Sequence, residues 1–158
     1  DSMQEIQRVD RIAKAANKVQ KVLLRITPGV EAHTHEAIST AHEDVKFGFS
    51  IASGAAWKAI NAAQSAANIS LEGLHCHIGS QIFENEGFIL ATKRLLELSA
   101  KFRDEFKSEL LELDLGGGYG IAYLAGDKTF DPNQVRGMTS HAIKNIKFLR
   151  PLFGLRNK

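Results

Sequence analysis

Three apolar runs of strand length alternate along this chain with three segments in which apolar residues recur at helical spacing. The runs cover residues 21–26, 69–78 and 110–115, and the first helical segment precedes the first run. Runs that are apolar on both faces are typical of parallel strands covered by helices. Their starts lie roughly 40 to 50 residues apart, which leaves room for a helix in each connection. The sequence therefore predicts an α/β fold with a parallel sheet and about three βα units.

The helical segments begin with residues that suit helix capping. Ser2 fits the N-cap position, and Glu5 stands three residues later, where it completes a capping box. Ser53 fits the N-cap of a helix over residues 54–67, and a long helix is predicted over residues 88–106. Because the chain opens directly on a helix, with no initiating methionine and no preceding strand, we expect it to be an internal piece of a larger protein.

The composition is that of a soluble globular domain. Hydrophobic residues make up 44% of the 158 residues, charged residues make up 24%, and the formal net charge is +2. This charge is too small to indicate a nucleic-acid partner or a membrane surface, and no apolar run approaches the roughly 18 to 20 residues that span a bilayer. Cys76 is the only cysteine, which excludes an internal disulfide and favours a reducing, cytoplasmic location.

Two strand ends carry the residues that indicate a binding site. Residues 74–81 read Leu-His-Cys-His-Ile-Gly-Ser-Gln, and residues 113–120 read Leu-Asp-Leu-Gly-Gly-Gly-Tyr-Gly. Ligands of parallel α/β folds bind at the carboxyl ends of strands. A Gly-Gly-Gly turn lets backbone N–H groups converge on an anion, and a following helix N-terminus would add partial positive charge. Ser80 adds a hydroxyl donor, His77 a flat ring that can donate a proton or stack on an aromatic cofactor, and Arg25 a cation. The residues that suggest a phosphate-bearing cofactor site at these strand ends are thus Arg25, His77, Gly79, Ser80, Gly116, Gly117 and Gly118.

Each of these residues also has a simpler structural explanation. The glycines can serve only as a tight strand-to-helix turn, Arg25 can form a structural ion pair, and His77 taken alone can be a core histidine. Alternation along the strand puts His75 on the same face as His77 and puts Cys76 on the opposite face, where packing is its expected role. The glycine spacing matches neither the dinucleotide fingerprint nor the phosphate loop of nucleotide-binding proteins.

A polar stretch over residues 30–45 contains residues that could be drawn as a metal site. His33 and His35 lie there beside Glu31 and Glu36. Their spacing matches no firm ligand pattern, and a solvated loop explains them more simply. We therefore predict no metal.

The two strand-end motifs closely resemble a known group of enzymes. Residues 73–81 and 113–121 are similar to the pyridoxal-phosphate-dependent decarboxylases of fold type III, the alanine-racemase-like group, and within it to the diaminopimelate decarboxylase family. Residues 24–26, 28–29 and 46–48 match the same family in the same order. The resemblance covers about residues 1–127, whereas residues 128–158 form a tail, basic in part, that does not match the family.

The resemblance implies that residues 1–127 form part of a pyridoxal-phosphate-binding (β/α)8 TIM barrel, in an enzyme that is usually a homodimer. The implied reaction converts a small amino acid, meso-2,6-diaminopimelate, to L-lysine and carbon dioxide, with pyridoxal 5′-phosphate as the electron sink. By motif, His77 would be the catalytic residue that stacks on the pyridine ring. Ser80 with Gly116, Gly117 and Gly118 would hold the phosphate, and Arg25 would lie near the ring oxygen of the cofactor.

Some parts of that family's site have no counterpart in this sequence. These are the lysine that binds the cofactor covalently, a Glu-Pro-Gly-Arg segment, and a cysteine-bearing segment that comes from the partner subunit. We therefore expect this chain alone to be inactive and the activity to belong to the full-length protein. Two alternatives stay open: a related decarboxylase that acts on ornithine, arginine or carboxynorspermidine, and a non-enzymatic phosphate-binding module.

Overall fold

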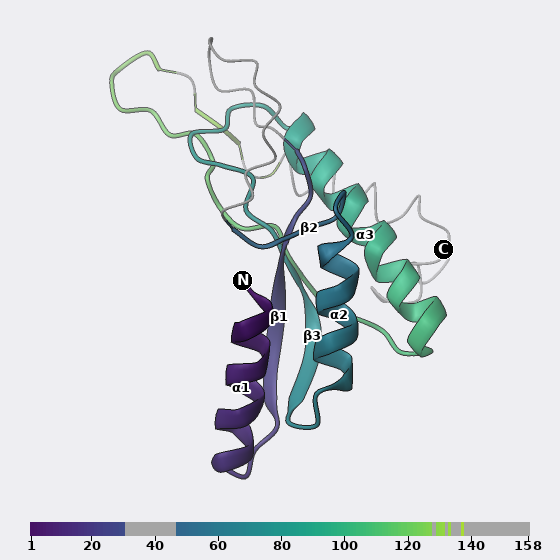
Figure 1. Ribbon diagram of the computed structural model, residues 1–158. Coiled ribbons are helices and arrows are strands. Elements are labelled where there is room, and N and C mark those ends of the chain that lie inside the picture. The colour runs from purple at the N-terminus through teal and green to yellow at the C-terminus, as the bar shows by residue number, and fades with distance from the viewer. Residues whose placement is uncertain (31–46, 128, 132, 134–136, 138–158) are drawn as a thin grey trace, which may run out of the picture.

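The computed structural model describes residues 1–30, 47–127, 129–131, 133 and 137, and Figure 1 shows their arrangement. Helices and strands alternate along the chain. Their order is α1 (Met3–Ala15), β1 (Gln20–Thr27), β2 (Phe49–Ser50), α2 (Ala55–Ser65), β3 (Ile69–His75), α3 (Glu86–Phe106) and β4 (Glu112–Asp114).

All four strands belong to one parallel sheet with the order β2-β1-β3-β4. β1 and β3 form its long central pair, which runs from Gln20 opposite Ile69 to Arg25 opposite His75. β4 adds three residues on the far side of β3. Gly73 permits this close approach, because a Cβ atom at that position would lie 2.0 Å from the carbonyl oxygen of Glu112. The predicted α/β class with a parallel sheet is therefore confirmed.

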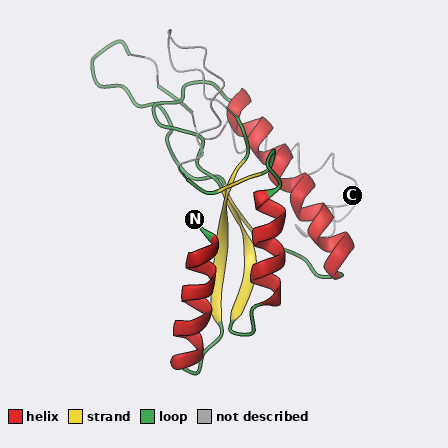
Figure 2. Ribbon diagram, viewed as in Figure 1, coloured by secondary structure: helices red, strands yellow, loops and turns green. Residues whose placement is uncertain are grey.

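The three helices pack against one face of the sheet, and Figure 2 shows them beside the strands. The core joins residues of all three helices to inward-facing strand residues. Its central members are Ile6, Leu24, Ile26, Ile60, Leu74, Leu95 and Phe102. The residues that alternate with these along the strands, Arg25 and His75 among them, are only half-buried. We predicted strands buried on both faces, but within the described residues the helices cover one face only.

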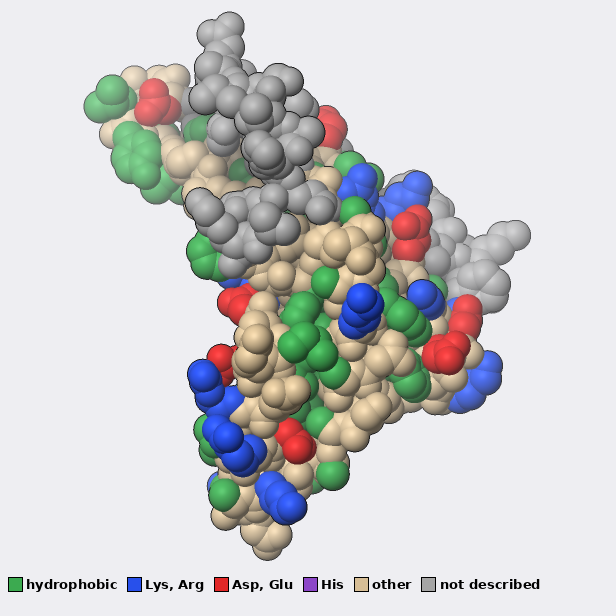
Figure 3. All heavy atoms as spheres, viewed as in Figure 1, with side chains coloured by type: hydrophobic (Ala, Val, Ile, Leu, Met, Phe, Trp, Pro, Cys, Tyr) green, Lys and Arg blue, Asp and Glu red, His purple; other side chains and the backbone are tan. Residues whose placement is uncertain are grey.

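α1 is an amphipathic helix with the predicted cap. The Ser2 hydroxyl accepts a hydrogen bond from the backbone N–H of Glu5 at 3.2 Å. Ile6 and Ala13 are buried, and Figure 3 shows Lys and Arg side chains along the part of the surface where α1 lies. This helix thus turns its apolar stripe to the sheet and its basic side to solvent.

The start of α2 differs from the prediction. Its N-cap is Gly54, in a left-handed conformation with φ 76°, and Ser53 instead belongs to a turn in which its N–H donates to the Ser50 hydroxyl. Glycine reaches this φ without steric cost, which a serine cannot do. α3 begins at Glu86, two residues before the predicted start, and no described helix is long and apolar enough to cross a membrane.

The strands are shorter than the apolar runs that predict them. β3 ends at His75 rather than at residue 78, and β4 covers only Glu112–Asp114. Both strands stop because the chain turns soon afterwards, at Gly79 with φ 139° and at Gly116 with φ 72°. His77 therefore lies two residues beyond the end of β3, and the prediction that places it within the strand is wrong.

Candidate functional site

The two connections that leave β3 and β4 run side by side. The N–H of Cys76 donates to the Asp114 carbonyl at 2.8 Å, and the N–H of Ile82 donates to the Gly118 carbonyl at 2.9 Å. Gly120 returns a hydrogen bond to the Ile82 carbonyl at 2.8 Å. The motif with His77 and the glycine turn thus form one continuous surface at the carboxyl ends of neighbouring strands.

Gly116 and Gly118 are required by this contact. A Cβ atom on Gly116 would lie 2.5 Å from the Cys76 carbonyl oxygen and 3.2 Å from Nδ1 of His77. A Cβ atom on Gly118 would lie 1.9 Å from the carbonyl oxygen of Gly79, and both glycines have positive φ. The simpler explanation, a tight turn, therefore accounts for these two glycines.

Gly117 is different, because a Cβ atom there would meet nothing within 4 Å. The space in the direction of its missing side chain is open, whereas Gly116 and Gly118 lie close to the other connection. A missing side chain at an open position leaves room for a ligand to approach the backbone closely. Of the three glycines in this turn, Gly117 is thus the one whose presence the packing of the described chain does not explain.

Asp114 engages one of the glycine N–H groups. Its Oδ1 accepts a hydrogen bond from the N–H of Gly116 at 2.8 Å. The turn is therefore ordered by a carboxylate of this chain, a role that the sequence analysis did not assign to Asp114. Residues 119–127, which directly follow the glycines, contain no helix, so the predicted helix N-terminus is absent from this turn.

Gln81 fastens the end of the first connection to the second. Its side-chain amide pairs with the backbone of Ile121, accepting from the N–H at 3.2 Å and donating to the carbonyl at 3.3 Å. Gln81 itself has φ 56°, which is uncommon for a residue with a side chain. The sequence analysis missed this role, because it depends on a partner 40 residues away.

His77 and Ser80 are both exposed at this surface. His77 is therefore not a core histidine, which removes the simpler explanation for it. Cys76 between the histidines is fully buried, and this burial raises the pKa of its thiol from the ordinary value of 9.0 to about 12. The thiol stays protonated and packs in the core, as expected.

Arg25 lies on β1, two strands away from the glycine turn. Its Nη1 is 3.8 Å from Oδ2 of Asp1, and its guanidinium carbon is 4.9 Å from the ring centre of Phe47. The side chains of Arg25 and Asp1 are 27% and 55% exposed, so this ion pair contributes little to stability. Arg25 thus forms the ion pair that its simpler explanation predicts, although this pair is too exposed to account for much stability.

Comparison with known proteins identifies the family. The sequence profile for the pyridoxal binding domain of pyridoxal-dependent decarboxylases matches residues 1–150. The chain belongs to the pyridoxal-dependent decarboxylases. Within this family it is similar to diaminopimelate decarboxylase of Corynebacterium efficiens, with 56% identity over 135 residues, and to that of Mycobacterium tuberculosis, with 53% identity over 131 residues.

Solved structures of decarboxylases agree with the sequence comparison. A diaminopimelate decarboxylase from M. jannaschii in complex with L-lysine matches 94% of this chain with a TM-score of 0.80 and 31% identity. The predicted fold, part of the TIM barrel of these decarboxylases, is confirmed. The chain spans 29% of the length of the two curated relatives and 34% of the M. jannaschii chain.

The decarboxylase family depends on pyridoxal, and the geometry of this surface fits a phosphate-bearing group. The open backbone at Gly117 and the exposed Ser80 hydroxyl lie on adjoining connections. Backbone N–H groups and a hydroxyl are the donors that commonly bind phosphate. The residues present are therefore compatible with the cofactor of the family.

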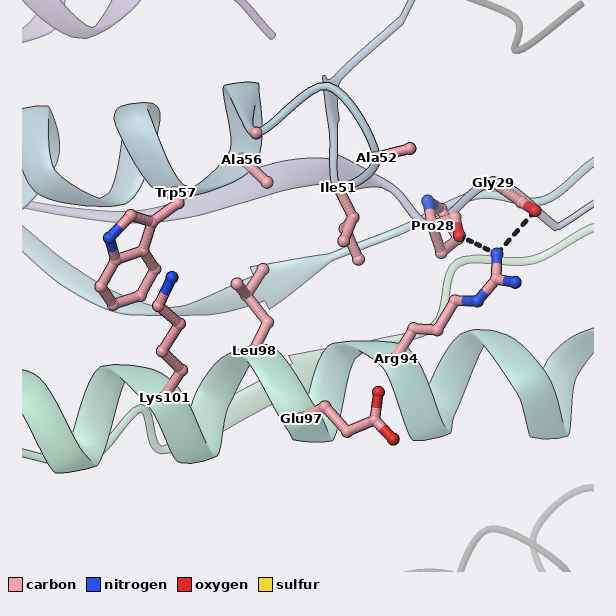
Figure 4. A pocket seen from close by; sticks show the side chains of 11 residues that line it. Pro28, Gly29, Ile51, Ala52, Ala56, Trp57, Arg94, Glu97, Leu98 and Lys101 are labelled. Carbon is pink, nitrogen blue, oxygen red and sulfur yellow. Dashed lines mark hydrogen bonds between the residues drawn. The ribbon is translucent and has the colours of Figure 1, made fainter.

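A separate groove of about 640 Å³ lies between α2 and α3, on the helical face (Figure 4). Figure 4 shows Trp57 and Lys101 directed toward one another, with the Lys101 ammonium 4.0 Å from the ring centre. Across the groove Arg94 donates hydrogen bonds to the carbonyls of Pro28 and Gly29. None of the predicted site residues lines this groove.

The sequence predicts no metal site at His33 and His35. His33 and His35 lie in 31–46, outside the described residues. In the described part of the chain no three His, Cys, Asp or Glu side chains are grouped so that they could hold a metal ion.

Proposed function

We propose that this chain forms one wall of the pyridoxal 5′-phosphate site of a diaminopimelate decarboxylase. The larger protein would convert meso-2,6-diaminopimelate to L-lysine and carbon dioxide. The observation that carries the proposal is the contact between the His77 connection and the glycine turn, with open space at Gly117 and an exposed Ser80 on the adjoining connection. The substrate follows the relatives, which are 56% and 53% identical and are diaminopimelate decarboxylases.

The residues of this wall would divide the work of holding the cofactor. Ser80 and the backbone of Gly117 and Gly118 would bind the phosphate, with Gly117 providing the closest approach. Gly116, whose N–H donates to Asp114, would shape the turn. His77 would place its exposed ring against the pyridine ring, and Arg25 would direct its cation to the ring oxygen. When bound, the cofactor would accept the electron pair that remains when the bond to the carboxylate carbon breaks and carbon dioxide leaves. The chain's own contribution is to bind and orient.

The active enzyme would need more protein than this chain. The sequence contains no counterpart to the family's covalent lysine motif or its Glu-Pro-Gly-Arg segment. We propose that a homodimer of the full-length protein, in the cytoplasm, is the active form. The boundary near residue 127 and the nature of residues 128–158 stay predictions, although the family profile extends to residue 150.

The test measures carbon dioxide release by the purified full-length protein with pyridoxal phosphate and one amino acid at a time. We expect release from meso-2,6-diaminopimelate and little from L-ornithine or L-arginine, and none from the 158-residue chain alone. Release from ornithine or arginine but not from diaminopimelate would overturn the substrate. Absence of release from every amino acid, with no bound cofactor, would favour a non-enzymatic module.

A pair of serine variants tests the wall itself. We expect Ser80→Ala to weaken binding of pyridoxal phosphate about tenfold, which corresponds to one charge-assisted hydrogen bond. Ser65→Ala is the matched control, because its hydroxyl bonds only to the Asn61 carbonyl within α2. Equal cofactor affinity in the two variants would contradict the assignment of Ser80.

A further inference from the structure

Three chemically complementary side chains occupy one row across the sheet. Arg25 on β1 is the register partner of His75 on β3, and His75 is the register partner of Asp114 on β4. Register partners on parallel strands point to the same face and are separated by the strand spacing of about 4.8 Å. Residues that carry a guanidinium, an imidazole and a carboxylate therefore occupy neighbouring backbone positions at the carboxyl end of the sheet.

This row lies on the face away from the helices. The preceding residues of the three strands, Leu24, Leu74 and Leu113, belong to the core or pack against it. Alternation then directs the row of Arg25, His75 and Asp114 to the other face. On that face Arg25 and His75 are half-buried and Asp114 is exposed.

The hydrogen-bonding capacities of the row match when His75 is neutral. Burial lowers the pKa of His75; Asp114 opposes this change, and Arg25 and His77 add to it. A neutral imidazole has one donor and one acceptor, whereas a guanidinium only donates and an ionised carboxylate only accepts. Neutral His75 can therefore accept from Arg25 and donate to Asp114, which no aliphatic residue could do.

The row ends in the glycine turn. The Asp114 carboxylate already accepts the N–H of Gly116 at 2.8 Å. A side chain that holds Asp114 in place therefore also holds this turn. At the other end, Arg25 contacts Phe47 and Asp1, and His75 is the row member whose backbone lies between Arg25 and Asp114.

We propose that His75 is a positioning residue that ties the Arg25 cation to Asp114 and, through Asp114, to the glycine turn. His75 would thereby set the distance between the Arg25 guanidinium and the glycine turn. The inference rests on the proposed function, in which these elements hold the ring oxygen and the phosphate of one cofactor. His75 itself would touch neither group.

The first experiment tests the row without any cofactor. Histidine titration is followed by NMR in the full-length apoprotein, with His75 assigned by substitution. We expect Asp114→Asn to lower the pKa of His75 and Arg25→Gln to raise it, because these partners act on it with opposite sign. Glu112→Gln, an exposed change on the same strand, should leave the pKa unchanged. If neither row variant moves the His75 pKa, the proposal is overturned.

The second experiment tests the consequence for the cofactor. We expect His75→Leu to raise the dissociation constant of pyridoxal phosphate about tenfold, or about 1.4 kcal/mol, while His75→Asn, which keeps a donor and an acceptor, stays within about threefold of the wild type. Thermal unfolding shows whether each variant is folded. If His75→Leu does not fold, His75→Ala replaces it, with the same tenfold loss expected.

The outcomes separate this inference from the proposed function. Wild-type affinity in folded His75→Leu, with the titration shifts present, would overturn the positioning role alone. A wild-type protein that shows the shifts but binds no pyridoxal phosphate would overturn the proposed function, and the positioning of a cofactor with it. If the row variants shift the His75 pKa and His75→Leu weakens cofactor binding while His75→Asn does not, both the positioning role and the proposed function are supported.

Discussion

Gly118 is the residue at which a single methyl group should disturb the site most. The Cβ of Gly118→Ala would lie 1.9 Å from the Gly79 carbonyl oxygen, at a backbone φ of 97° that alanine rarely adopts. We expect a loss of at least about 2 kcal/mol in the free energy of unfolding, from strain and from separation of the two connections. Urea unfolding of the purified protein measures this loss.

Gly117→Ala is the matched control for that variant. Its Cβ would meet nothing within 4 Å, so we expect the free energy of unfolding to change by no more than about 0.5 kcal/mol. If the two alanine variants were equally stable, the close contact between the connections would be wrong.

Cys76 should make stability depend on alkaline pH. The ordinary thiol pKa is 9.0 and the folded value is about 12, because the thiol is buried. Between these values the unfolded chain loses the proton and the folded chain keeps it, so stability falls as pH rises through this window. The slope approaches about 1.4 kcal/mol per pH unit.

The comparison with Cys76→Ala isolates this effect from lysine and tyrosine titration. Urea unfolding at pH 8 and pH 10 should show a larger loss of stability in the wild type than in the variant. The same loss in both proteins would mean that the thiol is accessible to solvent in the folded state.

At the scale of elements, Arg94 connects α3 to the turn that follows β1. Its Nη1 donates to the carbonyls of both Pro28 and Gly29. Arg94→Met keeps much of the aliphatic side chain and removes these hydrogen bonds, so we expect a loss of about 1 to 2 kcal/mol in the free energy of unfolding. Thermal or urea unfolding measures the loss.

Lys93→Met is the control on the same helix. Lys93 is exposed and precedes Arg94 by one residue, so we expect a change below about 0.5 kcal/mol. If Lys93→Met loses as much stability as Arg94→Met, the effect comes from removing a positive charge from α3 and not from losing the hydrogen bonds to Pro28 and Gly29.

At the scale of the whole molecule, the sheet is unevenly supported. β1 and β3 pair along six residue pairs, whereas β4 contributes three residues and has no second neighbour among the described strands. Strand edges with few buried contacts open more readily than central strands. We expect amide hydrogen exchange to be slowest in β1 and β3 and markedly faster in β4.

Hydrogen exchange on the chain, followed by mass spectrometry of peptides, tests this order. The peptides that cover β3 and β4 provide the comparison within one sample. Protection of β4 equal to that of β3 would show that something further covers this edge in solution.

Local pattern alone determined much of this protein. Helical spacing of apolar residues predicted α1, α2 and α3, and the Ser2 cap followed from residues that are three apart in sequence. The alternation of helices with apolar runs predicted the parallel sheet, and turn residues at the strand ends pointed to the carboxyl edge as the site. These features can be predicted from the sequence because the patterns that indicate them are local, such as the spacing of apolar residues within a helix or the composition of one strand and its turn.

The tertiary structure decided which of these residues meet and which stay open. Register between β1 and β3 shifts between Val22 and Leu23, so the row of Arg25, His75 and Asp114 is not deducible from spacing along the chain. Contact between the two connections separated Gly117 from its neighbours and placed His77 at the surface rather than in the core. Such pairings form between residues tens of positions apart, and their geometry depends on the packing of the whole sheet.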